Sequence, residues 1–206
     1  MRFLRLTLPA VLAGFLCACA TEPRWEATPD ARDRWQAREA RLNRLTTWNL
    51  DGRFGFTRKK QGFTASLAWN QAPGRYSLSL TGPLDQDIAH LEGEGGHHRI
   101  TVTGRGHFES DNVEDLLDEA IGYPLPLDKL RYWVRGLPDP SATDVRTLDA
   151  QGRLSKLEDD GWTVEFLRYT RIGDTELPAR INLENRWFTL KFAILDWQLD
   201  EVAAAR

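Results

Sequence analysis

Cysteine thiols are the groups in this chain whose type and position best suit covalent chemistry. The chain holds two cysteines, Cys17 and Cys19, and both lie near the amino terminus. Two cysteines are too few for a disulfide framework or a zinc site built from several thiolates. A thiol is also a strong nucleophile that can carry a covalent modification. The sequence therefore directs attention to a modification at the amino terminus.

The segment before these cysteines has the composition of a signal peptide. Two arginines precede an apolar stretch over 6–16, which is shorter than the roughly 20 residues that a helix needs to cross a bilayer. The sequence Leu16-Cys17-Ala18-Cys19 then resembles a bacterial lipobox, with a small residue directly before the second cysteine. We expect removal of 1–18 and lipidation of Cys19. The alternative is ordinary secretory cleavage without a lipid.

Lipidation at Cys19 would tether the chain to a membrane. Each buried acyl CH₂ contributes about 0.8 kcal/mol, so several acyl chains anchor a protein far more stably than one. By analogy with bacterial sorting signals, Ala20 in place of Asp after the cysteine predicts the outer membrane. We expect a lipidated tether over 19–32, one globular domain over 33–200 and a short tail over 201–206.

Motifs of catalysis are absent from the sequence, which contains no G-x-S-x-G, H-E-x-x-H, C-x-x-C or P-loop. His97 and His98 are adjacent, so in a strand their rings would point to opposite faces and could not share a metal. With 27 basic and 30 acidic residues, the chain lacks the basic excess typical of nucleic-acid binding. The sequence predicts no enzyme, cofactor or metal site and no nucleic-acid partner.

Elements that would position any site are mostly strands. Apolar and polar residues alternate in short runs separated by turn signals, which is typical of an antiparallel meander or barrel. The runs lie at 48–56, 63–69, 76–80, 88–91, 100–102, 153–157, 162–166, 179–183 and 187–199. Apolar spacing of three and four residues predicts helices over 113–121 and 127–135, and Pro29-Asp30 can start another that continues to Leu45. We expect nine to eleven strands.

The last of these runs is apolar on both faces. Leu190, Phe192 and Ile194 would share one face, and Leu195 and Trp197 the other. A strand that is apolar on both faces is typical of burial on both sides. We therefore predict that this strand lies inside the domain.

Aromatic residues are abundant, with 8 Trp, 9 Phe and 4 Tyr. A curled sheet either fills its interior with side chains or leaves a space for a small ligand. Large, stiff indoles at Trp69, Trp133, Trp162 and Trp197 could therefore line an apolar cavity for acyl chains. The alternative is a well-packed, Trp-rich core.

Two predicted turns carry residues that stand out. Pro83 and Leu84 lie within Thr81-Gly82-Pro83-Leu84-Asp85, where Gly and Pro end a strand and an apolar tip would be exposed. The alternatives are that the leucine folds back as an anchor for the loop or is one scattered apolar residue at the surface. The second turn carries Arg58-Lys59-Lys60, which either contacts phospholipid headgroups or is a solvated hairpin tip.

The order of several motifs resembles a known family. Leu130-Arg131-Tyr132-Trp133-Val134-Arg135-Gly136-Leu137-Pro138 is similar to the L-R-x-W-x-x-G-L-P signature of the LolB family of outer-membrane lipoprotein receptors. An early W-x-x-x-G-R over Trp48 to Arg53, the Gly82-Pro83-Leu84 turn and a terminal strand with Trp197 occur in the family's order. The similarity covers nearly the whole chain after the lipobox.

This resemblance implies a mainly β fold: a curled antiparallel half-barrel of about eleven strands, with about three helices over its open side and a hydrophobic cavity inside. It also implies a monomer that takes acylated lipoproteins from the periplasmic carrier LolA and inserts them into the inner leaflet of the outer membrane. Pro83 and Leu84 would form the loop that contacts membrane phospholipid. The expected cavity residues are Trp69, Leu78, Leu80, Trp133, Trp162 and Trp197. The alternative is a structural or assembly lipoprotein of the envelope with a solid core.

Overall fold

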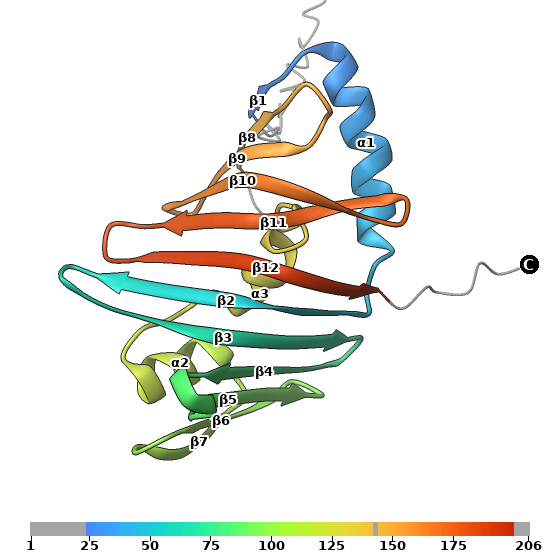
Figure 1. Cartoon of the computed structure of the whole chain (residues 1–206). Helices are drawn as coiled ribbons and strands as arrows, with labels where there is room; N and C mark the ends of the chain where they lie inside the picture. Colours follow the sequence, from blue (N-terminus) through green and yellow to red (C-terminus); the bar gives the residue numbers. More distant parts are fainter. Residues whose placement is uncertain (1–23, 142–143, 200–206) are drawn as a thin grey trace, which may run out of the picture.

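The structure is a computed structural model that describes residues 24–141 and 144–199. One twelve-stranded sheet runs through it in the order β1-β8-β9-β10-β11-β12-β2-β3-β4-β5-β6-β7 (Figure 1). The strands are β1 (Arg24–Glu26), β2 (Trp48–Arg58), β3 (Gln61–Ala72), β4 (Arg75–Thr81), β5 (Asp87–Glu94), β6 (His97–Val102), β7 (Gly106–Ser110), β8 (Val145–Leu148), β9 (Leu154–Asp159), β10 (Trp162–Ile172), β11 (Thr175–Glu184) and β12 (Thr189–Leu199).

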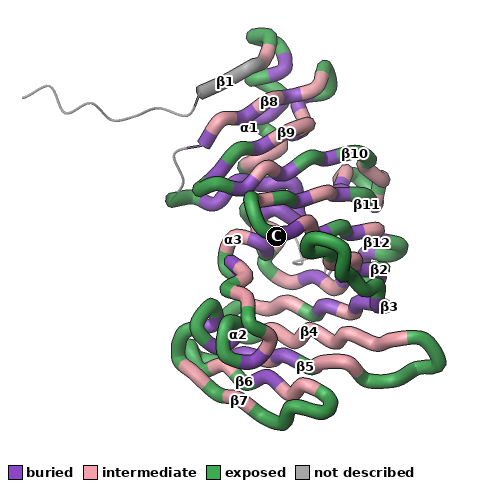
Figure 2. Tube along the Cα trace, turned by 90° about the vertical axis from the view of Figure 1, so that its left-hand side faces the viewer, coloured by how far each residue is buried: buried purple, intermediate pink, exposed green. Residues whose placement is uncertain are grey.

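The eleven strands β2 to β12 pair with one another in antiparallel fashion, and the short β1 pairs in parallel with β8. The sheet is curled but not closed, because β1 and β7 lie at opposite ends of the strand order. The three helices are α1 (Pro29–Asn43), α2 (Val113–Ile121) and α3 (Leu127–Trp133). Figure 2 shows α2 and α3 on the same side of the sheet. The predicted half-barrel of about eleven antiparallel strands with three helices is confirmed.

Helix α1 begins where Pro29 follows the capping residue Thr28, whose hydroxyl accepts a hydrogen bond from the backbone N–H of Ala31. Its thin apolar stripe is buried at Trp35 and Leu42. The sequence assigned 19–32 to a lipidated tether; within that range the structure has the unpredicted β1 and the first turn of α1, which begins at the predicted Pro29. The first described element, β1, therefore begins before the predicted helix.

Helices α2 and α3 occupy the predicted positions. Asn112 caps α2 by accepting hydrogen bonds from two backbone N–H groups, and Gly122 ends it in the left-handed conformation with φ 82°. The buried residues of α2 are Val113, Leu116, Leu117 and Ala120, in agreement with the predicted apolar spacing. Helix α3 ends at Trp133, two residues before the predicted end. Together these helices cover the concave face of the sheet.

The prediction that the last strand is buried on both faces is wrong. Leu195 of β12 is 74% exposed, whereas Ile194 and Trp197 on either side of it are buried. The register with β2 shifts between Ile194 and Asp196, which marks a β-bulge. A bulge adds one residue and reverses the side-chain alternation beyond it. Trp197 therefore joins Leu190 on the buried face, and the outer face remains exposed.

Candidate functional site

An apolar cavity of about 240 Å³ lies between the concave face of the sheet and the helices. Its wall comes from β2 to β6, from β12, from α2 and α3, and from the loop that joins the two helices. The lining side chains are aliphatic or aromatic, and the polar atoms among them are the Tyr123 hydroxyl and the Trp69 indole nitrogen. Apolar cavities of about 150 Å³ already bind a benzene-sized ligand. This cavity therefore suits part of an acyl chain.

Three of the residues that the sequence assigned to the cavity line it, namely Trp69, Leu78 and Leu80. They come together because Trp69 of β3 pairs with Leu78 of β4, and Leu67 pairs with Leu80. The same inward row continues through Leu91 on β5, directly opposite Leu78. The cavity wall at this point is a row of cross-strand neighbours.

The other three predicted cavity residues, Trp133, Trp162 and Trp197, do not line the cavity. Trp133 is fully buried on α3, and its ring centroid lies 5.9 Å from that of Trp162. Trp197 lies 5.5 Å from Trp48 and donates a hydrogen bond from Nε1 to the Pro178 carbonyl oxygen at 3.0 Å. All three indoles are buried and belong to the packed hydrophobic core. Alternation along the strands does not distinguish residues of the packed core from residues that line the cavity.

Several cavity residues were not assigned from the sequence. Phe54, Ile100 and Leu117 line the cavity from β2, β6 and α2, and Tyr123 and Leu125 line it from the loop between the helices. Phe54 and Ile100 lie in strands with the same alternation of apolar and polar residues as Trp69. Their inward orientation could therefore have been predicted from the sequence. The loop residues carry no periodic signal. Their position depends on how the two helices fold back over the sheet.

One end of the cavity is marked by a partly exposed aromatic residue. Phe63 lines the cavity and is 43% exposed, and its ring stacks on Phe56 with centroids 5.7 Å apart. Across the cavity wall, the Arg58 guanidinium lies 4.8 Å from the centre of the Tyr123 ring and donates a hydrogen bond to its hydroxyl at 3.0 Å. This end joins the cavity to a charged and aromatic surface.

Leu84 is exposed at the tip of the loop between β4 and β5, as the turn signal predicted. Its side chain is 91% exposed, and the alternative in which it folds back as an anchor is wrong. Pro83 begins a short 3₁₀ turn, and the Gly82 N–H donates to the Gln86 carbonyl oxygen at 2.7 Å, which closes the loop. Leu84 has φ 63° and ψ 32°, a conformation that is uncommon for a bulky side chain. The contribution of this leucine to membrane contact stays a prediction.

The two adjacent histidines lie on opposite faces of β6, as expected. His97 is exposed and its Nδ1 lies 2.9 Å from Asp111 Oδ1, and this hydrogen bond raises the pKa of His97. His98 is half-buried and its Nδ1 lies 2.8 Å from the Tyr76 hydroxyl. Burial lowers the pKa of His98. Among residues 24–141 and 144–199, no group of three or more His, Cys, Asp or Glu side chains could hold a metal ion.

Cys19, the predicted lipidation site, lies outside the described residues. Within the described part of the chain, every helix is too short or too polar to cross a membrane.

Comparison with known proteins identifies the family. The model of the family described as "Outer membrane lipoprotein LolB" matches residues 46–197. The outer-membrane lipoprotein LolB of Pseudomonas aeruginosa strain LESB58 is 36% identical over 197 residues, which cover 95% of this chain and 96% of that protein. The LolB protein of Pseudomonas putida strain KT2440 is 34% identical over 198 residues, 95% of this chain and 97% of that protein.

Solved structures share the fold at low sequence identity. A LolA superfamily protein from Nitrosomonas europaea superposes with a TM-score of 0.53 at 8% identity, over 82% of this chain and 94% of that one. A domain described as an outer membrane lipoprotein-sorting protein, from Vibrio parahaemolyticus, has a TM-score of 0.58 at 10% identity, over 82% and 92% of the two chains. The half-barrel is thus a known fold, and the family match over three quarters of the sequence shows that this chain belongs to the outer membrane lipoprotein LolB family.

Proposed function

We propose that this outer-membrane lipoprotein is a non-enzymatic receptor that holds the acyl chains of other lipoproteins in the cavity under β2 to β6. The single observation that carries this proposal is the cavity of about 240 Å³ with an almost wholly apolar wall. Family membership supports the same function and agrees with lipidation at Cys19. The alternative, a structural lipoprotein with a solid core, does not explain this cavity.

Acyl chains need such a cavity because each CH₂ that leaves an apolar environment for water costs about 0.8 kcal/mol. A carrier crossing the aqueous space between two membranes and a receptor accepting its cargo must each replace this contact. We infer that the lipoprotein arrives from the periplasmic carrier LolA and leaves for the inner leaflet of the outer membrane. Transfer in this direction needs only that each successive site binds more tightly, and a difference of about 1.4 kcal/mol gives a tenfold preference. The protein would therefore need neither a nucleotide nor a catalytic group.

Release into the membrane would involve Pro83 and Leu84. Leu84 is exposed, apolar and held at the tip of a closed loop, so it can enter the lipid without uncovering the core of the domain. Asp85, the next residue, is also exposed, and its carboxylate opposes deep insertion. We therefore expect shallow contact between this loop and the bilayer.

The experiment that tests the proposal separates uptake from release. LolA carrying a radiolabelled lipoprotein is mixed with the receptor, and label is followed to the receptor and then to phospholipid vesicles. We expect the wild-type protein to complete both steps and Leu84→Glu to accept the lipoprotein without releasing it. A protein that accepts no lipoprotein and binds no fatty acid would refute the receptor function. Loss of uptake in Leu84→Glu would instead show that Leu84 acts before release.

A further inference from the structure

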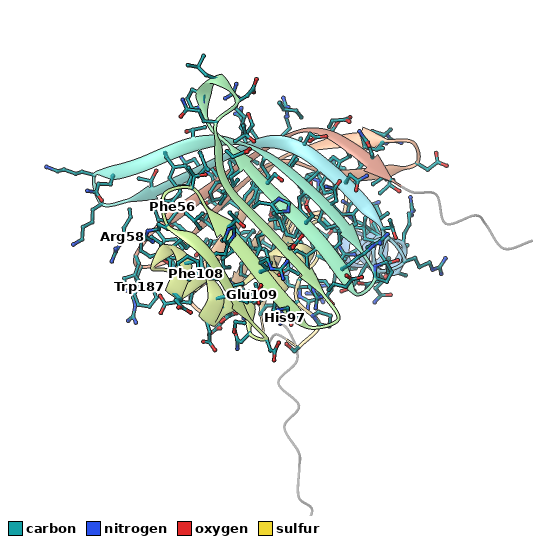
Figure 3. The ribbon with its side chains drawn as sticks, turned by 90° about the horizontal axis from the view of Figure 1, so that it is seen from below. Phe56, Arg58, His97, Phe108, Glu109 and Trp187 are labelled. Atoms are coloured by element: carbon teal, nitrogen blue, oxygen red, sulfur yellow. The ribbon has the colours of Figure 1, made fainter. Side chains whose placement is uncertain are left out.

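Two neighbouring turns at one end of the sheet carry exposed cations and aromatic rings. The first is the β2–β3 hairpin with Arg58, Lys59 and Lys60, and the second is the β11–β12 turn with Arg186 and Trp187. The turns are adjacent because β12 pairs with β2, with Thr189 opposite Thr57. Figure 3 shows Arg58 and Trp187 at the same end of the molecule, close to Phe56. We call Arg58, Lys59, Lys60, Phe63, Arg186 and Trp187 the basic aromatic rim.

The exposed ring of Trp187 is held outward by its turn. The Asn185 side chain accepts hydrogen bonds from the backbone N–H groups of Trp187 and Phe188 at 2.9 and 3.0 Å. Phe188 points inward and packs on Trp162 with centroids 5.3 Å apart, whereas Trp187 is 54% exposed. The Arg186 guanidinium lies 3.9 Å from the centre of the Trp187 ring. The core therefore needs Phe188, and the exposed indole has no packing role in it.

Positive charge in the rim contrasts with the rest of the chain. Residues 57–63 and 184–187 contain four cations and one carboxylate, Glu184, although acidic residues outnumber basic ones in the whole sequence. Such a local excess of cations is attracted to anionic headgroups within about a Debye length of the surface. Tryptophan is enriched at membrane interfaces because its ring is apolar and its N–H is polar. Cations beside an exposed indole thus match an anionic phospholipid surface.

The rim also lies directly beside the cavity. Phe63 belongs to both, and Arg58 contacts Tyr123 in the cavity wall. A membrane that touched the rim would bring its headgroups to the end of the cavity that holds these two aromatic residues. An acyl chain could then move between cavity and bilayer with a short exposure to water.

We propose that the basic aromatic rim binds anionic phospholipid headgroups and holds this end of the cavity against the bilayer, as a membrane contact separate from Leu84. The inference rests on the proposed function, since it assumes that cavity and bilayer exchange acyl chains. An acidic protein surface is the competing partner for four cations. The exposed indole and the continuity of the rim with the acyl cavity favour the lipid.

Vesicle binding without the acyl anchor tests this inference. The protein is residues 19–206 with Cys19→Ala, which retains every described residue. It is sedimented with vesicles of phosphatidylethanolamine and phosphatidylglycerol, or of phosphatidylcholine alone. We expect binding to the anionic vesicles that weakens as salt is added, and at least tenfold weaker binding for Lys59→Glu combined with Lys60→Glu. Trp187→Ser should weaken binding severalfold at unchanged charge.

A matched control reverses two charges elsewhere. Arg180→Glu combined with Lys191→Glu changes the net charge equally on exposed positions of β11 and β12, and it should leave vesicle binding within about twofold of the parent. Equal binding by the rim variants and this control would overturn the inference, as would equal binding to neutral and anionic vesicles. Loss of uptake from LolA by the rim variants, with vesicle binding intact, would assign the rim to an acidic protein instead. Fatty-acid binding by each variant is measured in parallel, so failure of the cavity is distinguished from failure of the rim.

Discussion

The Arg135 guanidinium lies 2.8 Å from the carbonyl oxygen of Leu45 and joins the end of α3 to the segment that follows α1. The same nitrogen donates to the Leu42 carbonyl oxygen at 3.2 Å, so one buried cation satisfies two acceptors near a helix end. Burial lowers the pKa of Arg135 to about 10, which leaves the side chain charged at neutral pH. Arg135 therefore has a structural role within the L-R-x-W-x-x-G-L-P signature.

Removal of this guanidinium should destabilise the fold. Arg135→Met keeps most of the apolar stem but removes the donor to the part-buried Leu45 carbonyl oxygen, whereas the Leu42 carbonyl oxygen still accepts from the Leu45 backbone N–H. We expect the free energy of unfolding to fall by about 2 kcal/mol or more, because a buried hydrogen bond from a charged group contributes about 1.5–3 kcal/mol. Urea denaturation measures the change. Arg131→Met is the control: its ion pair with Asp128 is exposed, so the loss should stay below about 1 kcal/mol. Equal losses in the two variants would contradict this role.

We expect any side chain at Gly52, within the W-x-x-x-G-R motif, to destabilise the fold. A Cβ at this position would lie 2.4 Å from the Ala193 carbonyl oxygen and 3.0 Å from the Ile194 Cα, next to the bulge in β12. Backbone atoms cannot yield as a flexible side chain can. We therefore expect Gly52→Ala to lower the free energy of unfolding by about 1–3 kcal/mol, as for other overpacked sites. Thermal or urea unfolding tests this value.

Gly55 on the same strand provides the matched control. A Cβ there would meet the Lys191 Cβ at 3.6 Å, an ordinary contact. Gly55→Ala should therefore leave stability nearly unchanged. If Gly52→Ala proved equally harmless, the close approach between β2 and β12 would not constrain this position.

Local periodicity was sufficient to predict most elements but not the site. Alternation in β2 and β3 and the spacing of Leu116 and Leu117 in α2 depend on nearest neighbours, which a sequence displays directly. The cavity depends on strand register, on curvature and on the fold of the helices over the sheet, which arise from long-range contacts. Trp197 illustrates the limit, since a single bulged residue moves it to the opposite face. Leu84 was predictable because Gly and Pro alone place it at a turn.

Blocking the cavity should abolish acyl binding without unfolding the sheet. Ala89 of β5 lines the cavity, and Ala89→Phe would place a benzyl group inside it. We expect the affinity for a fatty acid, measured by displacement of a fluorescent probe, to fall at least tenfold. Ala68→Phe is the control, because Ala68 alternates with the inward Trp69 on β3 and its added ring would face outward. Full affinity in Ala89→Phe would mean that acyl chains bind elsewhere.

His97 and His98 should titrate on opposite sides of pH 6.5. The hydrogen bond to Asp111 raises the pKa of His97, so its contribution stabilises the fold at low pH and is lost as pH rises through the folded-state pKa. Burial lowers the pKa of His98, so its contribution is present above pH 6.5 and is lost as pH falls through the folded-state pKa. NMR titration of the two rings measures both midpoints.

Asp111→Asn is expected to change the titration midpoint of His97 much more than that of His98. This substitution removes the carboxylate that hydrogen-bonds His97, so the His97 midpoint should fall toward 6.5. The His98 midpoint should change far less, because burial is the main cause of its shift. Equal midpoints for the two rings in the wild-type protein would contradict the opposite environments on β6.

We expect the left-handed conformation of Leu84 to lower the free energy of unfolding, while the exposed side chain of this residue contributes to membrane contact. A left-handed backbone conformation costs roughly 1–2 kcal/mol for an ordinary residue, whereas Asn tolerates it well. Because Leu84 is 91% exposed, Leu84→Asn loses no burial and should raise the free energy of unfolding by about 1 kcal/mol. It should also impair release of lipoprotein into vesicles. Asp85 has φ 56°, and Asp85→Asn should leave stability nearly unchanged while improving release, because it removes a carboxylate beside the inserting leucine. Destabilisation by Leu84→Asn would show instead that the leucine packs against the fold.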